Sequence, residues 1–141
     1  MSFEFDDSDF LRLLNDKVSD ITKESIERMH DSVDDLARIS VDIAPIDKTT
    51  LRRSVNKEVF QEGDKIIGEV SFSATEQDGK GRFNYALWTH EMDYELGEQS
   101  QASPGTDGYQ TGNKYLQRPL EGESEKYLKW LAEGVVGGIN K

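Results

Sequence analysis

A long run of helical periodicity near the N-terminus constrains the fold more than any other feature. Its apolar residues recur mostly at steps of three or four, as one stripe of an α-helix requires: Phe10, Leu14, Val18, Ile21, Met29, Val33, Leu36 and Ala37. A continuous helix over residues 9–38 would be about 45 Å long at 1.5 Å per residue, which is longer than a compact domain of this size. We therefore expect this helix either to break or to extend beyond the rest of the domain.

Signals for extended structure follow this helical run. Pro45 pushes Ala44 toward extended geometry, so the helical pattern is expected to stop within residues 40–47. Residues 54–60 have strand character, and residues 61–64 contain the glycine and aspartate of a hairpin turn. These signals together predict the first strand and the turn of a β-hairpin.

The clearest alternation of apolar and polar residues lies at residues 65–74. It predicts a half-buried antiparallel strand whose inward face carries four apolar residues: Ile66, Val70, Phe72 and Ala74. Glu69 and Ser71 are then expected to point to solvent. Residues 75–82 are predicted to form a loop, and residues 83–90 a further strand.

The last third of the chain combines a long loop with a second helical pattern. Residues 91–113 are acidic and rich in glycine and serine, so we expect a long acidic loop that is mobile in the free protein. A second apolar stripe then predicts a C-terminal helix that ends at Gly137 and Gly138. The members of this stripe recur at helical spacing: Leu116, Leu120, Tyr127, Leu128, Leu131 and Val135.

These patterns predict a single α+β domain over residues 1–141. Its antiparallel sheet is expected to have three to five strands, with the long N-terminal helix and the C-terminal helix packed on one face. Residues 1–8 are expected to form a flexible N-terminal arm. No apolar run approaches the roughly 20 residues that span a bilayer, so no membrane association is expected.

The composition argues against several classes of function. Asp and Glu total 28 against 17 Lys and Arg, which gives a formal net charge of −11. Tight binding to duplex DNA requires clustered cations that neutralise phosphates, so sequence-specific DNA recognition is not expected. The chain has no cysteine, which removes disulfides, thiolate nucleophiles and cysteine-based zinc sites.

The sequence offers no catalytic signature. His90 and Glu91 match half of a zinc-protease motif, but its second histidine would have to stand where the chain has Tyr94. His90 and Glu91 with Asp93 and Glu95 could gather a hard cation, although a solvated acidic turn explains the same residues. The nucleophile elbow, the dinucleotide motif and the phosphate-binding loop are all missing. We therefore predict no catalytic residue, no cofactor and no metal.

Three short segments stand out when they are taken in order along the chain. The first is a proline-led box with five matches: Pro45, Asp47, Leu51, Arg52 and Ser54. The second is a Tyr-Ala box that ends on an acid: Tyr85, Ala86 and Glu91. The third opens the last helix: Lys114, Tyr115 and Leu116. Together they resemble the phage neck and tail-component family over residues 35–136, with Thr49 standing where the family usually has glycine.

The resemblance implies a structural virion protein at the joint between the head and the tail of a phage. Members of the family are neck, minor capsid or tail-completion proteins, so we expect a homo-oligomeric ring, with a hexamer favoured over a dodecamer. Such a ring contacts connector and tail proteins while DNA passes through it without sequence-specific binding. The protein would lie in the host cytoplasm during assembly and then in the virion neck or tail. Three aromatic residues are the candidate interface: Trp88, Tyr94 and Tyr109.

Two other classes of function remain open. An acidic protein-binding module, such as an inhibitor that mimics DNA, would spread carboxylates over one face at phosphate-like spacing. An enzyme would require a bound metal or a reactive pocket around His90. The structural virion protein is the leading prediction because only this class accounts for the three ordered segments.

Overall fold

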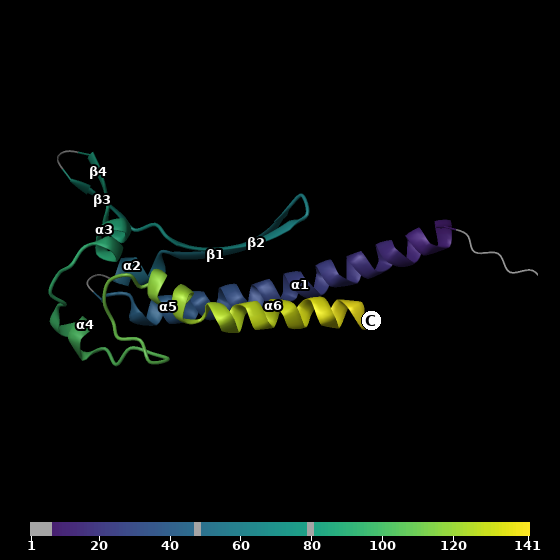
Figure 1. Ribbon diagram of the computed structural model, residues 1–141. Helices are drawn as coiled ribbons and strands as arrows, with labels where there is room; N and C mark the ends of the chain where they lie inside the picture. Colours follow the sequence, from purple (N-terminus) through teal and green to yellow (C-terminus); the bar gives the residue numbers. More distant parts are fainter. Residues whose placement is uncertain (1–6, 47–48, 79–80) are drawn as a thin grey trace, which may run out of the picture.

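The computed structural model describes residues 7–46, 49–78 and 81–141, and it confirms an α+β fold. The elements follow in this order: α1 (Asp7–Ile43), α2 (Thr49–Arg53), β1 (Val55–Glu62), β2 (Lys65–Phe72), β3 (Thr75–Asp78), β4 (Gly81–Asn84), α3 (Tyr85–Glu91), α4 (Glu98–Ala102), α5 (Gln117–Gly122) and α6 (Ser124–Ile139). The short helices gather at one end of the molecule, here called the core end (Figure 1). Helices α1 and α6 and hairpin β1–β2 extend away from it as a stem.

Helix α1 is unbroken and extends beyond the other elements of the stem (Figure 1). Its 37 residues span about 55 Å at 1.5 Å per residue. Of the two outcomes that the sequence left open, the structure shows the overhanging helix, whose N-terminal turns expose apolar side chains: Leu11, Leu14 and Val18. Residues 1–6 of the expected flexible arm lie outside the described residues, and Asp7 and Ser8 belong to α1.

The end of α1 falls within the predicted segment 40–47. The helix ends at Ile43, two residues before Pro45, and Ala44 is the residue that leaves it. Ser40, Val41 and Asp42 are weak helix formers, but they remain helical because the last turn of α1 is anchored by buried residues. Ile39, Ile43 and Ala44 are fully inaccessible to solvent, so tertiary packing outweighs their local preference.

Strands β1 and β2 form an antiparallel hairpin along α1. Their register runs from Val55 opposite Phe72 to Glu62 opposite Lys65. The predicted turn contains Gly63 with a φ of 63°, a left-handed geometry that glycine adopts without steric cost. The two predicted strands and the turn between them are therefore confirmed.

The face of β2 that packs on α1 is the predicted one. Gly68 lies so close to α1 that an added Cβ atom would stand 2.5 Å from Cγ2 of Val33. Side chains alternate along a strand, so Val70 and Phe72 share this face, and both are partly buried. Glu69, on the opposite face, is exposed.

The predicted sheet of three to five strands is present only in part. The described residues form two separate two-stranded sheets, β1–β2 and β3–β4. Residues 75–82, predicted as a loop, contain most of hairpin β3–β4. The strand predicted at residues 83–90 is wrong beyond Asn84, the last residue of β4. There the Asn84 Oδ1 atom accepts a hydrogen bond from the Leu87 amide at 3.0 Å and caps helix α3.

The predicted C-terminal helix divides into two. Helix α5 ends at Gly122, and α6 begins at Ser124 with a change of direction between them. Helix α6 then runs antiparallel to α1 and makes its extensive contact with that helix rather than with the hairpin (Figure 1). The two long helices therefore pack on each other, whereas the sequence predicted that both would cover one face of a sheet.

The buried face of α6 carries glycines in place of large apolar residues. Gly134 and Gly138 are buried together with Tyr127, and an added Cβ on Gly138 would stand 2.6 Å from the backbone nitrogen of Ile21 in α1. The backbones of α1 and α6 are therefore in direct contact, and α6 continues through the glycines that were predicted to end it. Several members of the predicted stripe are exposed instead: Leu120, Leu128 and Val135.

The acidic segment 91–113 is more ordered than the predicted long loop. It contains α4 and a short bridge between Thr106 and Tyr109. Two hydrogen bonds fasten it to the end of α1. The Gly112 amide donates to the Ile43 carbonyl at 2.9 Å, and the buried Ser100 hydroxyl accepts a bond from the Ile46 amide at 2.7 Å.

Candidate functional site where the three motifs meet

The first motif caps the C-terminal end of α1. Arg52 Nε donates to the Ala44 carbonyl at 2.9 Å, and Nη2 donates to the Asp42 carbonyl at 3.0 Å. The last carbonyls of a helix have no partner within the helix, so the guanidinium supplies the missing donors. Pro45 and Leu51 are buried beside this contact. Burial of the guanidinium itself disfavours its charged form and lowers the pKa of Arg52.

The second and third motifs meet through Tyr115. Its side chain is 1% exposed, and its hydroxyl donates to the Ala86 carbonyl at 2.7 Å. Burial raises the pKa of Tyr115 to about 12, so the hydroxyl keeps its proton as a donor. The ring packs edge-on against Phe72 and His90, with the ring centroids 5.0 Å apart in each case.

These contacts bring the three motifs into one apolar core. Leu51, Ala86 and Tyr115 come from one motif each, and they join four buried residues: Ile39, Ile43, Ala44 and Ala74. Two further motif residues pack against this cluster: Tyr85 and Leu116. Asp47 lies outside the described residues. Segments that are far apart in the sequence are thus joined by the residues that define the motifs.

An apolar hollow of about 390 Å³ opens where the second and third motifs meet. Its lining is mainly apolar and comes from β2, α3, α5 and the residues just before α5: Phe72, Ala86, Leu87, Tyr115, Leu116 and Leu120. His90 also lines it, and its Nε2 atom is buried with no hydrogen-bond partner among the described residues. Such a hollow suits a small apolar group that carries one hydrogen-bonding atom.

His90 and Glu91 form a pair beside this hollow. Nδ1 of His90 lies 2.9 Å from Oε1 of Glu91, and the Lys114 ammonium contacts the other carboxylate oxygen. Hydrogen bonds from Lys114 and then from His90 lower the pKa of Glu91. A positioned imidazole acts as a general base only toward a group within its reach. The described residues that line the hollow include no Ser, Thr or Cys.

The acids near His90 do not gather around a common point. Glu91 is paired with Lys114, and Oδ1 of Asp93 accepts a hydrogen bond from Asn113 Nδ2 at 3.1 Å. Within the described ranges, no three His, Asp or Glu side chains are arranged to hold a metal ion. The hard-cation site that the sequence left open therefore lacks its geometry here.

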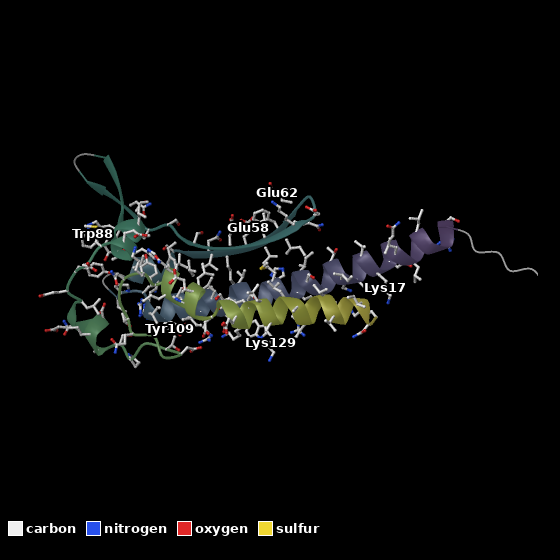
Figure 2. All side chains as sticks on the ribbon, in the orientation of Figure 1. Lys17, Glu58, Glu62, Trp88, Tyr109 and Lys129 are labelled. Atoms are coloured by element: carbon white, nitrogen blue, oxygen red, sulfur yellow. The ribbon has the colours of Figure 1, made fainter. Side chains whose placement is uncertain are left out.

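Two of the three candidate interface aromatics lie together. Trp88 and Tyr94 stack with ring centroids 5.3 Å apart and 20° between the ring planes, and Trp88 is 39% exposed. The Tyr94 hydroxyl donates to the Thr89 carbonyl at 2.6 Å, which fixes the stack. Tyr109 lies apart from Trp88 (Figure 2) and packs partly buried against the core. The three aromatics therefore do not form a single surface.

A charge network that the sequence analysis missed ties the acidic segment to both long helices. Arg38 of α1 bonds both carboxylate oxygens of Asp107, at 3.1 and 2.9 Å, and also contacts Asp35 at 2.9 Å. Lys126 and Tyr127 of α6 reach the same Asp35 carboxylate at 2.7 and 2.9 Å. Because 69 residues separate Arg38 from Asp107, no local pattern in the sequence points to this network.

Acid is expected to release the acidic segment from this network. Hydrogen bonds from Arg38 and then from Thr106 hold the pKa of Asp107 at about 2, below the ordinary value of 3.8. A carboxyl group whose pKa is lowered by folding stabilises the fold above its ordinary pKa, and this stabilisation is lost as the pH falls through the lowered value. We therefore expect hydrogen exchange in residues 103–112 to accelerate, beyond the intrinsic effect of pH, between about pH 4 and pH 2.

The variant Asp107→Asn is the control for this acid-dependent release. Asparagine tolerates the left-handed backbone of this position, where φ is 53°, but it has no charge to lose. Its exchange should already be faster at pH 5 and should show no further step in acid. An identical acid step in the wild type and in Asp107→Asn would contradict the assignment to Asp107.

Comparisons with protein-family models, with curated proteins and with solved structures find no match to this chain. The resemblance to phage neck and tail components therefore rests on the three sequence segments alone and stays a prediction. Over the described residues, no helix is both long enough and apolar enough to cross a membrane.

Proposed function

We propose that this chain is a structural virion protein of a tailed phage. Its role is that of a ring-forming neck or tail-completion subunit, similar to a tail terminator, at the head-to-tail joint. The observation that carries the proposal is the meeting of Leu51, Ala86 and Tyr115 in one buried cluster. A chance match to three short boxes gives no reason for their residues to pack together. The chain would act in the host cytoplasm during assembly and then in the virion neck or tail.

The structure of the stem fits a subunit whose sheet is completed by neighbouring proteins. Among the described residues, β1 and β2 pair only with each other, so each strand has one edge of unpaired backbone groups. Strands added at these edges by a neighbouring connector or tail protein would build the sheet of three to five strands that the sequence predicts. Helix α1, which packs on the hairpin, would then cover one face of the completed sheet.

The acidic segment supports a channel through which DNA passes. Its carboxylate residues are exposed: Glu91, Asp93, Glu95, Glu98 and Asp107. A surface of this sign repels phosphate, the reverse of the basic patches that hold nucleic acid. We place this segment at the lumen of the ring, where it lets the genome move without adhering.

Assembly of a phage that encodes this chain tests the proposal. An amber mutation in its gene is expected to leave filled heads and separate tails, seen by electron microscopy, and purified wild-type protein should restore joining in the lysate. Trp88→Ala should fold but restore joining at least about tenfold less well, because interface energy concentrates in large aromatic residues. The double variant His90→Ala, Glu91→Ala should restore joining if it folds, since no turnover is involved.

Two results would contradict the structural role. One is the formation of joined, infectious particles in the amber lysate without added protein. The other is a folded His90→Ala, Glu91→Ala variant that fails while Trp88→Ala succeeds. The second result would instead assign the function to the hollow and would favour an enzyme.

An acidic protein-binding module is the second candidate, and one feature of the hairpin favours it. Glu58 stands directly opposite Glu69, where like charges destabilise a sheet. Figure 2 shows Glu58 and Glu62 on the side of the hairpin that is directed away from α1. A cationic partner would relieve this repulsion. Salt-sensitive binding of a basic, DNA-binding protein that is lost in Glu58→Gln, together with normal joining in the amber lysate, would favour this candidate.

A further inference from the structure

The exposed apolar residues near the N-terminus of α1 continue a face that is covered further along the helix. Leu11, Leu14 and Val18, here called the overhang stripe, are 52%, 47% and 54% exposed. Ile21 follows at the same helical spacing and lies against Gly138 of α6. The overhang stripe is therefore in line with the contact between α1 and α6.

No described segment covers the overhang stripe. Beside Ile21 the neighbouring helix is α6, which ends at Ile139. The Lys17 ammonium contacts the Lys141 carbonyl, so the residues after α6 lie level with Lys17. The first turns of α1 extend beyond this point without a neighbour among the described elements (Figure 1). The overhang stripe is thus an apolar helix face that no described element covers.

Helix α6 carries a second exposed apolar stripe. Its members recur at steps of four, three and four: Leu128, Ala132, Val135 and Ile139. Leu128 is 65% exposed and Ile139 is 52% exposed. This α6 stripe lies beside the glycine face that contacts α1, so it stays uncovered when α6 is docked. It has the spacing of one side of a two-helix seam.

We propose that the overhang stripe of one copy packs on the α6 stripe of a second copy of this chain. The overhang stripe covers about 10 Å of helix and the α6 stripe about 16 Å, at 1.5 Å per residue, so the longer stripe accepts the shorter one along its full length. Each stripe continues or borders the α1–α6 contact within one chain. The contact between copies therefore pairs α1 with α6, as within one chain, but through a different face of α6.

The contact joins two different surfaces, so it is heterologous. A heterologous contact between two copies uses the overhang stripe of one and the α6 stripe of the other, so the pair keeps one free surface of each kind. Further copies can add at these surfaces, and the assembly closes into a ring when the rotation between copies permits. The closed form rests on the proposed function, which requires a ring. The contact itself is a property of the purified protein and is tested without phage particles.

Matched glutamine variants test this contact in solution. The overhang variant replaces Leu11, Leu14 and Val18, and the α6 variant replaces Leu128, Val135 and Ile139. All six side chains are exposed, so the fold should be retained, which circular dichroism checks. Leu13→Gln is the control, because Leu13 is 59% exposed but lies on another side of α1.

Native mass spectrometry and sedimentation velocity should show oligomers for the wild type and for Leu13→Gln. Both stripe variants should self-associate at least about tenfold more weakly.

Mixing the two stripe variants gives the decisive measurement. Each variant keeps the surface that the other has lost, so one good contact forms and the mixture should yield a heterodimer and nothing larger. Heterodimer formation also shows that both variants are folded. Three results would overturn the proposal: a wild type that stays monomeric at every concentration, an α6 variant that associates normally, and a mixture without heterodimer. The second of these would show that two overhang stripes pack on each other.

The lysate experiment separates this inference from the proposed function. Wild-type protein that restores joining but shows no self-association in solution would leave the function in place and remove the second-copy contact. Wild-type protein that associates through the two stripes but does not restore joining would keep the second-copy contact and remove the proposed function.

Discussion

Replacing Tyr115 with alanine is expected to lower the free energy of unfolding by about 3–5 kcal/mol, as for other large core aromatics. The ring is almost fully buried and lies between Phe72 and His90. Its removal would leave a cavity at the junction of the three motifs and would remove the hydroxyl that donates to the Ala86 carbonyl. Urea unfolding followed by circular dichroism should show a lower midpoint, or no folded baseline.

The variant Tyr115→Phe separates the ring from the hydroxyl. It keeps the packing and removes only the donor to Ala86, whose carbonyl has one other, longer contact from Thr89 at 3.4 Å. We expect a loss of about 0.5–1.5 kcal/mol, the net contribution of a typical hydrogen bond. Equal losses in Tyr115→Ala and Tyr115→Phe would show that the ring packs loosely and would contradict the described core.

Adding a single methyl group to Gly138 is expected to have the opposite effect from adding one to Gly137. In Gly138→Ala the new Cβ would collide with the backbone of Ile21 in α1, so the helices must separate at a cost of about 1–3 kcal/mol, as in other overpacked sites. In Gly137→Ala the nearest atom would be Oε2 of Glu24 at 3.9 Å. That change should stabilise α6 by up to about 1 kcal/mol through helix propensity.

Thermal unfolding of these two glycine variants, made in the same background, checks the pair. A lower midpoint for Gly138→Ala and an unchanged or higher midpoint for Gly137→Ala are expected. The comparison is sharp because the substituted positions are adjacent and the chemical change is identical. A destabilised Gly137→Ala with a neutral Gly138→Ala would mean that α6 docks on α1 through a different face.

The parts of the fold that could be predicted are those that local patterns determine. Helix α1 follows from a periodicity of more than seven turns, and hairpin β1–β2 follows from alternation around Gly63. Helix α3 is predicted as a strand because Phe83, Tyr85 and Leu87 recur at every second position, as on one face of a strand. The signal that identifies it is Asn84, whose side chain caps the helix and competes with the preference of its neighbours for extended structure.

The parts that could not be predicted depend on contacts between distant segments. Helical periodicity predicts that large apolar residues lie between two packed helices. Helix α6 instead buries Gly134 and Gly138, because its backbone approaches that of α1. The resemblance supplied the motif residues of the candidate site. The hollow and the unpaired Nε2 of His90 could not be predicted, because they exist only once β2, α3 and α5 are in place.

The order in which the chain is synthesised gives the core a late closing step. Ile39 and Leu51 emerge early from the ribosome, whereas Tyr115, which packs with them, emerges after most of the chain has been made. Contacts across such separations form slowly, because the entropy of closing the loop is lost before any packing is gained. Until then α2 and the hairpin β1–β2 are the main described elements that pack on α1. The growing chain therefore carries its longest helix half-covered through most of translation, a state in which premature association is a hazard.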